Sequence, residues 1–377
     1  MNEKILVINP GSTSTKIAIF MGDQQIFKQT VSHDVEVLKQ FPNATDQLDY
    51  RKETILGALK AAHIEISDCA AFSGRGGGLA SCRGGVYEIN DAILKDARSG
   101  KYADHPACLG NLIAYDFAQT YHARAFTVNP PSTDEFRTVA RVTGLKDVTR
   151  FSNTHALNQK ETAMRVARDL GLAYDQANFI VAHLGGGVSI GAHDHGRIVD
   201  CNDNIKGDGP MAPTRIGTLP ARDLIDMCYS GKWSHEEMLL YLSKTGGFVD
   251  HLGTSETLEV AQRIREGDQY AKLIYDAFKY QVAKQIGAMA AVLRGKIDAI
   301  VLTGGIANDQ ELVRDLTEMI GFLAPVEVRA GEFEMEALAS GALRVLRGEE
   351  QPQVYDGVPV FSDFEYLKKE HPACGQK

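Results

Sequence analysis

Apolar and polar positions alternate in two short stretches of the chain, and turn residues divide each stretch into three parts. The first stretch, residues 4–31, reads as a β-meander, and residues 178–203 read as a second one. The six expected strands lie at residues 4–9, 15–20, 24–31, 179–184, 188–193 and 197–201. Gly11 and Gly185 occupy the first turn of each meander and lie 185 − 11 = 174 positions apart. That spacing is too long for a solenoid repeat and indicates a duplicated domain.

Elsewhere, apolar residues recur every three or four positions, which is the period of an amphipathic helix. Helices are predicted at residues 46–63, 105–121, 132–144, 158–170, 221–228, 234–242, 268–293, from 309, and at 334–347, and further strands at 126–131, 296–303 and 326–330. The predicted fold is therefore α/β, with mixed sheets flanked by helices. We predict two domains, residues 1–150 plus 336–377 and residues 151–335, with the last helix returning to the first domain. No low-complexity linker separates them, so we expect a central cleft.

Composition narrows the class of protein. The 377 residues are 44% hydrophobic and 24% charged, which excludes global disorder. Forty Lys and Arg against 49 Asp and Glu give a net charge of −9, so a nucleic-acid partner is not expected. No stretch approaches the ~20 apolar residues of a membrane span, and no signal peptide begins the sequence, so we expect a cytoplasmic protein without a membrane partner. The six cysteines form no C-x-x-C pair and are expected to be buried, reduced thiols: Cys69, Cys82, Cys108, Cys201, Cys228 and Cys374.

The first turn, residues 9–16, has the composition of a phosphate-binding loop. Its glycine lets the backbone approach an anion, and its hydroxyls and lysine supply donors and charge. The sequence is not a Walker A motif, because it lacks the second glycine before the lysine and a strand follows it. The candidate phosphate ligands are Asn9, Gly11, Ser12, Ser14 and Lys16. An ordinary Gly/Ser turn is the alternative for this segment alone.

Two further glycine motifs follow. Gly185, Gly186 and Gly187 come directly after His183-Leu184, where consecutive glycines leave N–H groups open to an anion. Ile190 stands where the last glycine of a dinucleotide-binding motif would be, which disfavours a dehydrogenase. Gly304 and Gly305 end a buried strand and offer a flat surface for a nucleobase and ribose, although an ordinary strand-to-helix turn is the simpler explanation when this motif is taken alone.

In this order, the three motifs resemble the actin-like ATPase superfamily with its ribonuclease H-like domains, and within it the acetate and butyrate kinases. The stretches LVINPGSTSTK, HALNQK, VAHLGGGVSI, VDHLGTSE and IVLTGGIA are most similar to the butyrate kinases, and the resemblance covers nearly the whole chain. It implies ATP and Mg²⁺ as cofactors, a short-chain carboxylic acid as substrate, and a homodimer or higher homo-oligomer.

The resemblance also implies roles for individual residues. Arg75 corresponds to the arginine on the substrate side, and Arg215 and His155 correspond to residues that face the transferred phosphoryl group. His183 is implied at the nucleotide, and the remaining pocket positions are Gly77, His105 and Pro213. Taken alone, each arginine could equally be a surface charge, and each histidine a core residue.

For the metal, the resemblance implies Glu334, with Glu336 as the near alternative. A carboxylate at the start of a helix is the plain structural explanation of either. The family usually has an aspartate where this chain has Asn129, so direct metal ligation at position 129 is in doubt. Asp134 lies nearby in sequence, and whether it takes over that role is left open.

The implied reaction is reversible, direct, in-line phosphoryl transfer from ATP to an already ionised carboxylate, which needs no general base. Acetate kinases carry bulky β-branched residues just after the equivalent arginine, whereas this chain has Gly76, Gly77 and Gly78. We therefore expect room for extra methylenes and a preference for butyrate or isobutyrate over acetate. The same glycines could instead serve only the turn. Acetate or propionate kinase activity, an actin-like nucleotide switch and a hydroxyl-directed kinase remain the alternatives.

Overall fold

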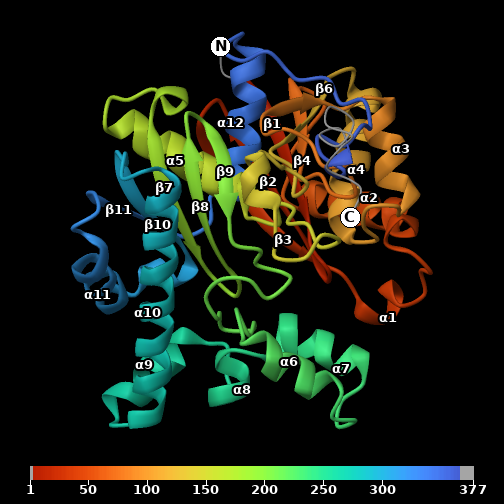
Figure 1. The fold of residues 1–377 in the computed structure, drawn as a ribbon. Coiled ribbons are helices and arrows are strands. Elements are labelled where there is room, and N and C mark those ends of the chain that lie inside the picture. Colours follow the sequence, from red (N-terminus) through yellow and green to blue (C-terminus); the bar gives the residue numbers. More distant parts are fainter. Residues whose placement is uncertain (1–2, 366–377) are drawn as a thin grey trace. The chain divides into compact units, whose positions relative to one another are not determined.

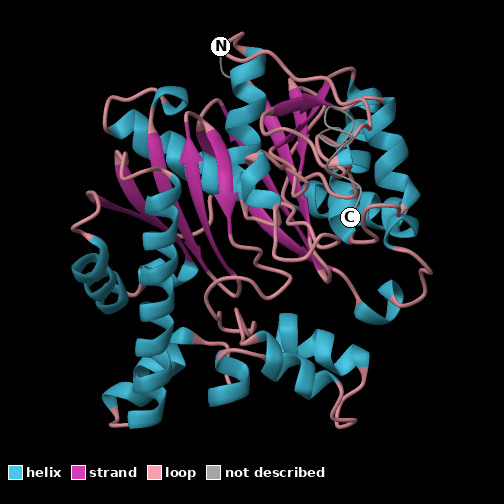
Figure 2. Cartoon of the chain, in the orientation of Figure 1, coloured by secondary structure: helices cyan, strands magenta, loops and turns pink. Residues whose placement is uncertain are grey.

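The structure is a computed structural model that describes residues 3–365. Within it the chain forms two compact units. Unit 1 contains the residues up to Asp134, Arg141–Arg150 and the segment from Met335 onward, and unit 2 contains Glu135–Ala140 and Phe151–Glu334. Figure 1 labels the elements along the chain, and Figure 2 shows that each unit is built on a sheet flanked by helices.

The sheet of unit 1 has six strands in the order β3-β2-β1-β4-β6-β5. Three consecutive antiparallel strands begin it: β1 (Lys4–Pro10), β2 (Ser14–Met21) and β3 (Gln24–Ser32). β4 (Ala71–Gly74) and β6 (Arg124–Val128) then join in parallel with β1, and β5 (Val86–Glu88) pairs antiparallel at the edge.

The sheet of unit 2 has five strands in the order β9-β8-β7-β10-β11. Here too a three-strand meander leads: β7 (Asn178–Leu184), β8 (Val188–Asp194) and β9 (Arg197–Cys201). β10 (Ala299–Gly304) and β11 (Val326–Ala330) continue in parallel with β7. The order β3-β2-β1-β4-β6 repeats as β9-β8-β7-β10-β11, with the same strand directions. Both predicted meanders and the predicted mixed α/β fold are confirmed.

Each unit also contains helices, and some of them pack on its sheet. Unit 1 carries α1 (Val35–Leu38), α2 (Leu48–Ala61), α3 (Asp91–Ser99), α4 (Leu109–Tyr121) and most of α12 (Glu334–Leu346). Unit 2 carries α5 (Ala156–Asp169), α6 (Ala221–Cys228), α7 (His235–Leu240), α8 (Phe248–Leu252), α9 (Thr257–Arg265), α10 (Gln269–Val292) and α11 (Gln310–Ile320).

The long helix α10 illustrates why the elements form where they do. Asp268 caps its first turn by accepting from the N–H groups of Tyr270 and Ala271. The predicted apolar stripe that runs from Ile274 to Leu293 is buried in the main core of unit 2. Each fully buried side chain on that stripe contributes about 1.5–3 kcal/mol. α12 packs in unit 1, where Ser73 Oγ donates to the Leu338 carbonyl at 2.8 Å.

The helix predicted for residues 132–144 is wrong, since only Thr138–Arg141 form one short 3₁₀ turn. Tertiary contacts hold this segment extended. The Asp134 carboxylate forms two 2.7 Å hydrogen bonds with the Arg141 guanidinium, and both side chains are almost fully buried. On the other side of the segment, the Arg137 N–H donates to the Val199 carbonyl at 3.0 Å. These bonds outweigh the weak local preference for helix.

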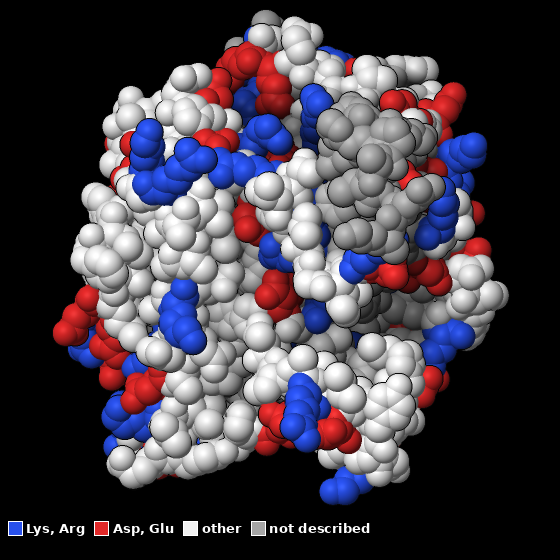
Figure 3. Space-filling view, in the orientation of Figure 1, with Lys and Arg blue, Asp and Glu red and all other residues white. Residues whose placement is uncertain are grey.

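The cysteine prediction is confirmed in part. Cys69, Cys82, Cys108 and Cys201 are buried, but Cys228 is exposed at the end of α6, where the short helix buries none of its residues. Cys374 lies outside the described residues. Within residues 3–365, no helix is both long and apolar enough to cross a bilayer. On the face drawn in Figure 3, positive and negative side chains are interspersed.

Candidate functional site

The turn between β1 and β2 forms the first candidate phosphate loop. It is closed by the Gly11 N–H, which donates to the Ser14 carbonyl at 2.7 Å. Asn9 is buried at the end of β1 and pairs with Lys16 across the hairpin. The backbone of this loop is thus fixed by the two strands on which it stands.

A buried arginine that the sequence analysis did not single out lies beneath this loop. Arg51, on α2, is fully buried, and its Nη1 and Nη2 donate to the carbonyl oxygens of Gly11 and Ser12, each at 2.9 Å. Its Nε donates to Gln47 Oε1 at 3.0 Å. Burial lowers the pKa of Arg51 to about 10, so the guanidinium stays charged at neutral pH. It turns the loop carbonyls inward and places a positive charge under the loop.

Arg75 follows β4 directly, at the carboxyl end of the parallel strands β1 and β4. Its N–H donates to the Ile8 carbonyl at 2.9 Å, which continues the β1–β4 pairing. Ligands of open α/β sheets bind at this edge. His105, before the 3₁₀ turn Pro106–Cys108, accepts the Ala107 N–H on Nδ1 at 3.1 Å. Burial, followed by the charges of Arg75 and Arg51, lowers the pKa of His105, so this ring is a neutral group close to two cations.

The start of α4 approaches the end of β4 with no room for side chains. A Cβ built on Gly74 would lie 2.0 Å from the Gly110 carbonyl oxygen, and one built on Gly110 would lie 2.0 Å from the Arg75 carbonyl oxygen. Two glycines therefore set the distance between the strand and the helix, and with it the place where Arg75 leaves the sheet.

The three glycines after Arg75 do not open an acyl pocket in the way the sequence analysis expected. A Cβ on Gly76 would lie 2.5 Å from Thr127 Oγ1, and a Cβ on Gly77 would lie 3.0 Å from the Ala107 Cβ. Gly78 has φ +69°, and its Cβ would lie 2.7 Å from Cys108 Sγ. Neighbouring atoms already fill these directions, so the glycines allow close packing against the 106–111 segment and leave no added space for methylenes.

In unit 2, the glycine turn between β7 and β8 holds Arg215. A Cβ on Gly187 would lie 1.8 Å from Arg215 Nη1, so the guanidinium rests directly on this glycine. Arg215 comes from a tight turn that begins at Ala212 and includes Pro213, and Thr214 Oγ1 ties this turn to the Gly186 carbonyl at 2.9 Å. Arg215 Nη1 donates to the Asn204 carbonyl at 2.7 Å, whereas its buried Nε has no hydrogen-bond partner among the described residues. Burial lowers the pKa of Arg215 below its usual value.

Two histidine rings are stacked beside the glycine turn between β7 and β8. The rings of His155 and His183 lie 3.9 Å apart at 14°. Asn158 Oδ1 accepts the Phe333 N–H at 2.8 Å, which orients its amide so that Nδ2 donates to His183 Nδ1 at 2.9 Å. The neutral His183 ring therefore carries its proton on Nε2. This nitrogen lies 3.2 Å from the position that a Cβ on Gly185 would take. It thus faces the glycine turn, and Glu332 Oε1 lies 4.0 Å from it.

The third glycine motif ends β10. Gly304 has φ +90°, and its Cβ would lie 2.2 Å from the Leu184 carbonyl oxygen, so only glycine fits there. Gly304 and Gly331 exchange two backbone hydrogen bonds of 3.0 and 2.9 Å. No atom of residues 3–365 lies within 4 Å of the position that a Cβ on Gly305 would take, which leaves an open surface beside the strand end.

The candidate metal ligands differ in whether their side-chain oxygens already accept hydrogen bonds. Asn129 Oδ1 accepts the Gly85 N–H at 2.8 Å, and the Asn129 N–H returns a bond to the Gly85 carbonyl at 2.9 Å. Asp134 is held by Arg141 through both carboxylate oxygens. Glu336 has a buried Oε2 without a hydrogen-bond partner in the described part of the chain. Residues 3–365 contain no group of three or more His, Cys, Asp or Glu that could hold a metal ion.

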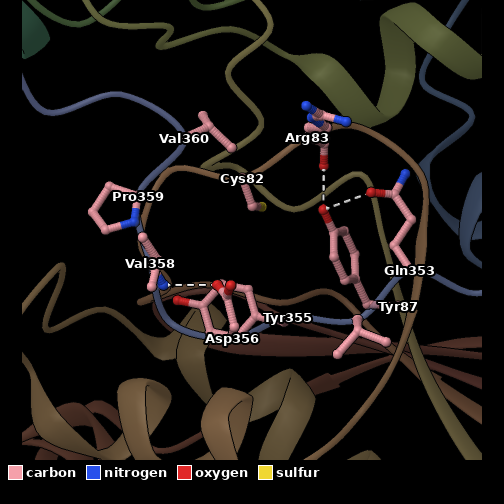
Figure 4. Close-up of a pocket in the computed structure, with 10 residues that line it drawn as sticks. Cys82, Arg83, Tyr87, Gln353, Tyr355, Asp356, Val358, Pro359 and Val360 are labelled. Atoms are coloured by element: carbon pink, nitrogen blue, oxygen red, sulfur yellow. Dashed lines mark hydrogen bonds between the residues drawn. The ribbon is translucent and has the colours of Figure 1, made fainter. Parts of the chain in front are cut away.

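One cavity of unit 1 lies away from these residues. It has a volume of about 620 Å³ in unit 1 and lies between the segments 82–87 and 353–360 (Figure 4). Tyr87 donates to the Arg83 carbonyl at 2.7 Å on its wall. None of the predicted site residues lines it.

Within unit 1, then, the structure brings Arg75 and His105 into one neighbourhood and sets Arg51 beneath the first loop. Within unit 2 it gathers His155, His183, the 185–187 turn, Arg215 and the end of β10. Sequence reasoning missed Arg51 and Asn158. Asn158 stands inside the quoted stretch HALNQK, which was the one available signal, whereas Arg51 lies in an unremarkable helix.

The fold and these glycine turns define a class of proteins with two mixed α/β units, and comparison with known proteins identifies the group. The profile of the acetokinase family matches residues 139–333, just over half of the chain. The chain belongs to the acetokinase family. Membership indicates a kinase that uses ATP to phosphorylate a short-chain carboxylate.

Solved structures agree on the fold. The chain is similar to Porphyromonas gingivalis acetate kinase, with 20% sequence identity and a TM-score of 0.75, covering 91% of this chain and 100% of the other. It is similar to a propionate kinase from Francisella tularensis at 20% identity and TM-score 0.71, covering 89% and 98%. For Entamoeba histolytica acetate kinase the identity is 18%, the TM-score 0.72, and the coverage 90% and 98%.

Proposed function

We propose that the chain transfers the terminal phosphoryl group of ATP to the carboxylate of a short-chain fatty acid, with butyrate or a branched acid such as isobutyrate as acceptor. The observation that carries the proposal is the Arg215 guanidinium resting on Gly187 in the turn between β7 and β8. A cation with an unpartnered buried Nε, set on a glycine turn, suits an anionic oxygen. The family match supports the carboxylate as acceptor.

The chemistry requires little beyond positioning and positive charge. A carboxylate is ionised at neutral pH and attacks phosphorus without a general base. The obstacle is the repulsion between two anions, which fixed cations and hydrogen-bond donors reduce. In this mechanism Arg75 binds the acceptor carboxylate, and Arg215 and His155 donate to the oxygens of the transferring group. The neutral His105 beside Arg75 borders the acceptor.

The two glycine turns bind the phosphates in this mechanism. The first loop contributes its N–H groups, the Ser12 and Ser14 hydroxyls and Lys16, with its carbonyls held inward by Arg51. The second contributes the N–H groups of 185–187 and the Nε2–H of His183. Gly304 and Gly305 bind the nucleoside, because the open space beside Gly305 accepts a flat ring.

Magnesium fits one of the candidate carboxylates better than the others. The buried Glu336 Oε2 lacks a partner among residues 3–365, which suits a cation or its bound water, whereas Asn129 and Asp134 are engaged. Mg²⁺ needs only one or two carboxylates together with phosphate oxygens and water. We therefore assign the metal-associated role to Glu336 and keep Glu334 as its alternative. When bound, Mg²⁺ neutralises charge on the phosphates.

The preferred acid rests on the motif resemblance to butyrate kinases. The packed glycines 76–78 give it no support. The structural relatives are named acetate and propionate kinases, so C2 and C3 acids belong in every test.

Hydroxamate formation tests the function directly. The chain is incubated with ATP, Mg²⁺, hydroxylamine and each straight or branched acid from C2 to C6. We expect hydroxamate with at least one C2–C5 acid, highest with C4. Arg75→Ala should abolish the signal, and Arg98→Ala, on the exposed last turn of α3, should not. No product with any acid would overturn the kinase assignment. Product with acetate alone would overturn the butyrate preference. ATP hydrolysis stimulated by peptide, or phosphorylation of an alcohol, would favour the nucleotide switch or the hydroxyl-directed kinase.

A further inference from the structure

A stripe of polar side chains lies on one face of β8, opposite the face that carries the core residues Val188, Ile190 and Ala192. Ser189, Gly191 and His193 alternate with core residues along the strand, and the two side chains of this stripe are fully buried. Gln159, on α5, is also fully buried and lies over Gly191, whose absent Cβ would meet Gln159 Oε1 at 2.4 Å. Buried polar groups of this kind need hydrogen-bond partners, and here they satisfy one another.

The Gln159 amide has only one orientation that satisfies its neighbours. Nε2 lies 3.2 Å from the Ser189 carbonyl oxygen, which can only accept. The amide NH₂ therefore faces Ser189, and Oε1 faces His193 Nε2 at 3.0 Å. Since Oε1 can only accept, His193 carries its proton on Nε2. His193 Nδ1 then accepts from the Tyr174 hydroxyl at 2.8 Å.

The other end of the chain of bonds reaches His155. Ser189 Oγ accepts the second Nε2–H of Gln159 at 2.7 Å and the His155 backbone N–H at 3.4 Å. Its own proton is then left to donate to His155 Nδ1, 2.8 Å away. Every hydrogen bond from Tyr174 through His193, Gln159 and Ser189 to His155 runs in the same direction.

The environment keeps the interior of this chain neutral. Burial, followed by the nearby Lys160 ammonium, lowers the pKa of His193 to about 3. Burial and the Glu135 carboxylate raise the pKa of Tyr174 well above its usual value. Neither group changes its charge near neutral pH, so the direction of the bonds is fixed there.

We propose that Gln159 and Ser189 are positioning residues that hold His155 as the tautomer protonated on Nε2. The ring is fixed on one side by Ser189 and on its face by the stacked His183 ring. A transferring phosphoryl group then meets a donor already placed, and no rotation or proton shift is needed. The inference rests on the proposed function only in giving His155 a phosphoryl group to face.

Nitrogen NMR of the imidazole rings tests the assignment without any turnover. The full chain is labelled with ¹⁵N-histidine, and the His155 signals are identified by their loss in His155→Asn. We expect a protonated Nε2 and an unprotonated Nδ1 whose shift shows an accepted hydrogen bond. In Ser189→Ala the Nδ1 signal should move toward that of a nitrogen without a hydrogen bond, and in Gln159→Met it should move less. Thr162→Val, which removes a bond to the Asn158 carbonyl on the same helix, should leave it unchanged.

A protonated Nδ1 in the unmodified chain, or an unchanged Nδ1 signal in Ser189→Ala, would overturn the proposal. Kinetics give a second readout. Ser189→Ala should lower kcat by roughly 10- to 100-fold while KM for the acid stays within about twofold, since ring placement and not acid binding is lost. Unfolding midpoints show whether each variant is folded. If no acid yields hydroxamate, the proposed function fails, yet the ring signals still decide this inference. If hydroxamate forms but the His155 Nδ1 signal is the same in Ser189→Ala as in the unmodified chain, the tautomer proposal is overturned and the proposed function is not.

Discussion

The Arg51 guanidinium donates to the carbonyl oxygen of Gly11, 40 positions earlier in the sequence, over 2.9 Å. The arginine is fully buried, and within residues 3–365 its hydrogen bonds go to carbonyl, amide and hydroxyl oxygens and none to a carboxylate. Neutral oxygens do not cancel the positive charge of the buried guanidinium. The charge can therefore attract an anion that binds at the loop.

Replacing this arginine should therefore weaken both the fold and phosphate binding. In Arg51→Met the part-buried hydrogen bonds to the carbonyls of Gly11 and Ser12 are lost, which should lower the free energy of unfolding by about 2–4 kcal/mol. ATP affinity should fall, while adenosine affinity should not, because adenosine lacks the phosphates that the loop binds. Denaturant unfolding and calorimetric titration measure the two effects. Arg98→Met is the matched control, and an equal loss of adenosine binding would contradict the role given to the loop.

Asn129 should prove structural. Its side chain holds Gly85, and its φ of +39° suits asparagine and aspartate better than other side chains. Asn129→Ala should lower the free energy of unfolding by about 1–3 kcal/mol, and Asn129→Asp, which keeps the acceptor, by less. The Mg²⁺ concentration for half-maximal rate should stay the same in Asn129→Asp. A lower requirement for Mg²⁺ would instead show that position 129 reaches the metal.

Glu336 gives the complementary test. Removing its charge in Glu336→Gln should raise the Mg²⁺ concentration needed for half-maximal hydroxamate formation by roughly 10-fold. Glu334→Gln is the paired variant, with a smaller expected change. If the larger shift appears in Glu334→Gln, the two assignments exchange.

The packing of Gly78 can be separated from its backbone conformation. Gly78 and Gly100 have similar φ values of +69° and +64°, but in the described part of the chain no atom lies within 4 Å of the position that a Cβ on Gly100 would take. Gly100→Ala should lower the free energy of unfolding by about 1 kcal/mol for the left-handed backbone alone. Gly78→Ala should cost about 1–3 kcal/mol more, because its methyl group meets Cys108 Sγ. Equal losses in urea unfolding would show that the space at Gly78 is open after all.

His33 makes stability depend on pH. It is buried beside the first loop, where Nε2 bonds with Thr15 Oγ1 at 2.8 Å, and burial followed by the Arg51 charge lowers its pKa to about 4. Unfolded histidine titrates near 6.5, so between about pH 6.5 and 4 the unfolded chain binds a proton that the folded chain does not. Stability should fall as the pH falls through this window, and less steeply in His33→Gln. The exposed His235 gives the control variant His235→Gln, and the same slope in His33→Gln as in the unmodified chain would refute the assignment.

Much of the fold was readable because local patterns determined it. Alternating residues and glycine turns set both meanders, and the period of α10 placed its buried stripe correctly. The segment 132–144 was misjudged because the backbone N–H groups of Asp134 and Arg137 donate to the carbonyls of Cys82 and Val199, which are far away in sequence, and no local pattern records such bonds.

For the site, sequence motifs identified residues but not their surroundings. The glycines after Arg75 were noticed, yet their purpose depends on Thr127, Ala107 and Cys108, which only the folded chain brings near. Arg51 and Gln159 sit on ordinary helices and acquire meaning from the carbonyls and hydroxyls they meet. The roles of Arg75, His155 and Arg215 in catalysis stay predictions.

The contact between Gly74 and Gly110 restricts how this part of the chain can evolve. A methyl group at Gly74 would meet the Gly110 backbone, and one at Gly110 would meet the Arg75 backbone, so a mutation at one glycine is not rescued by any substitution at the other. In distant relatives we expect the two glycines to be kept or lost together. Their joint loss would indicate that Arg75 no longer holds this position and no longer has the same role.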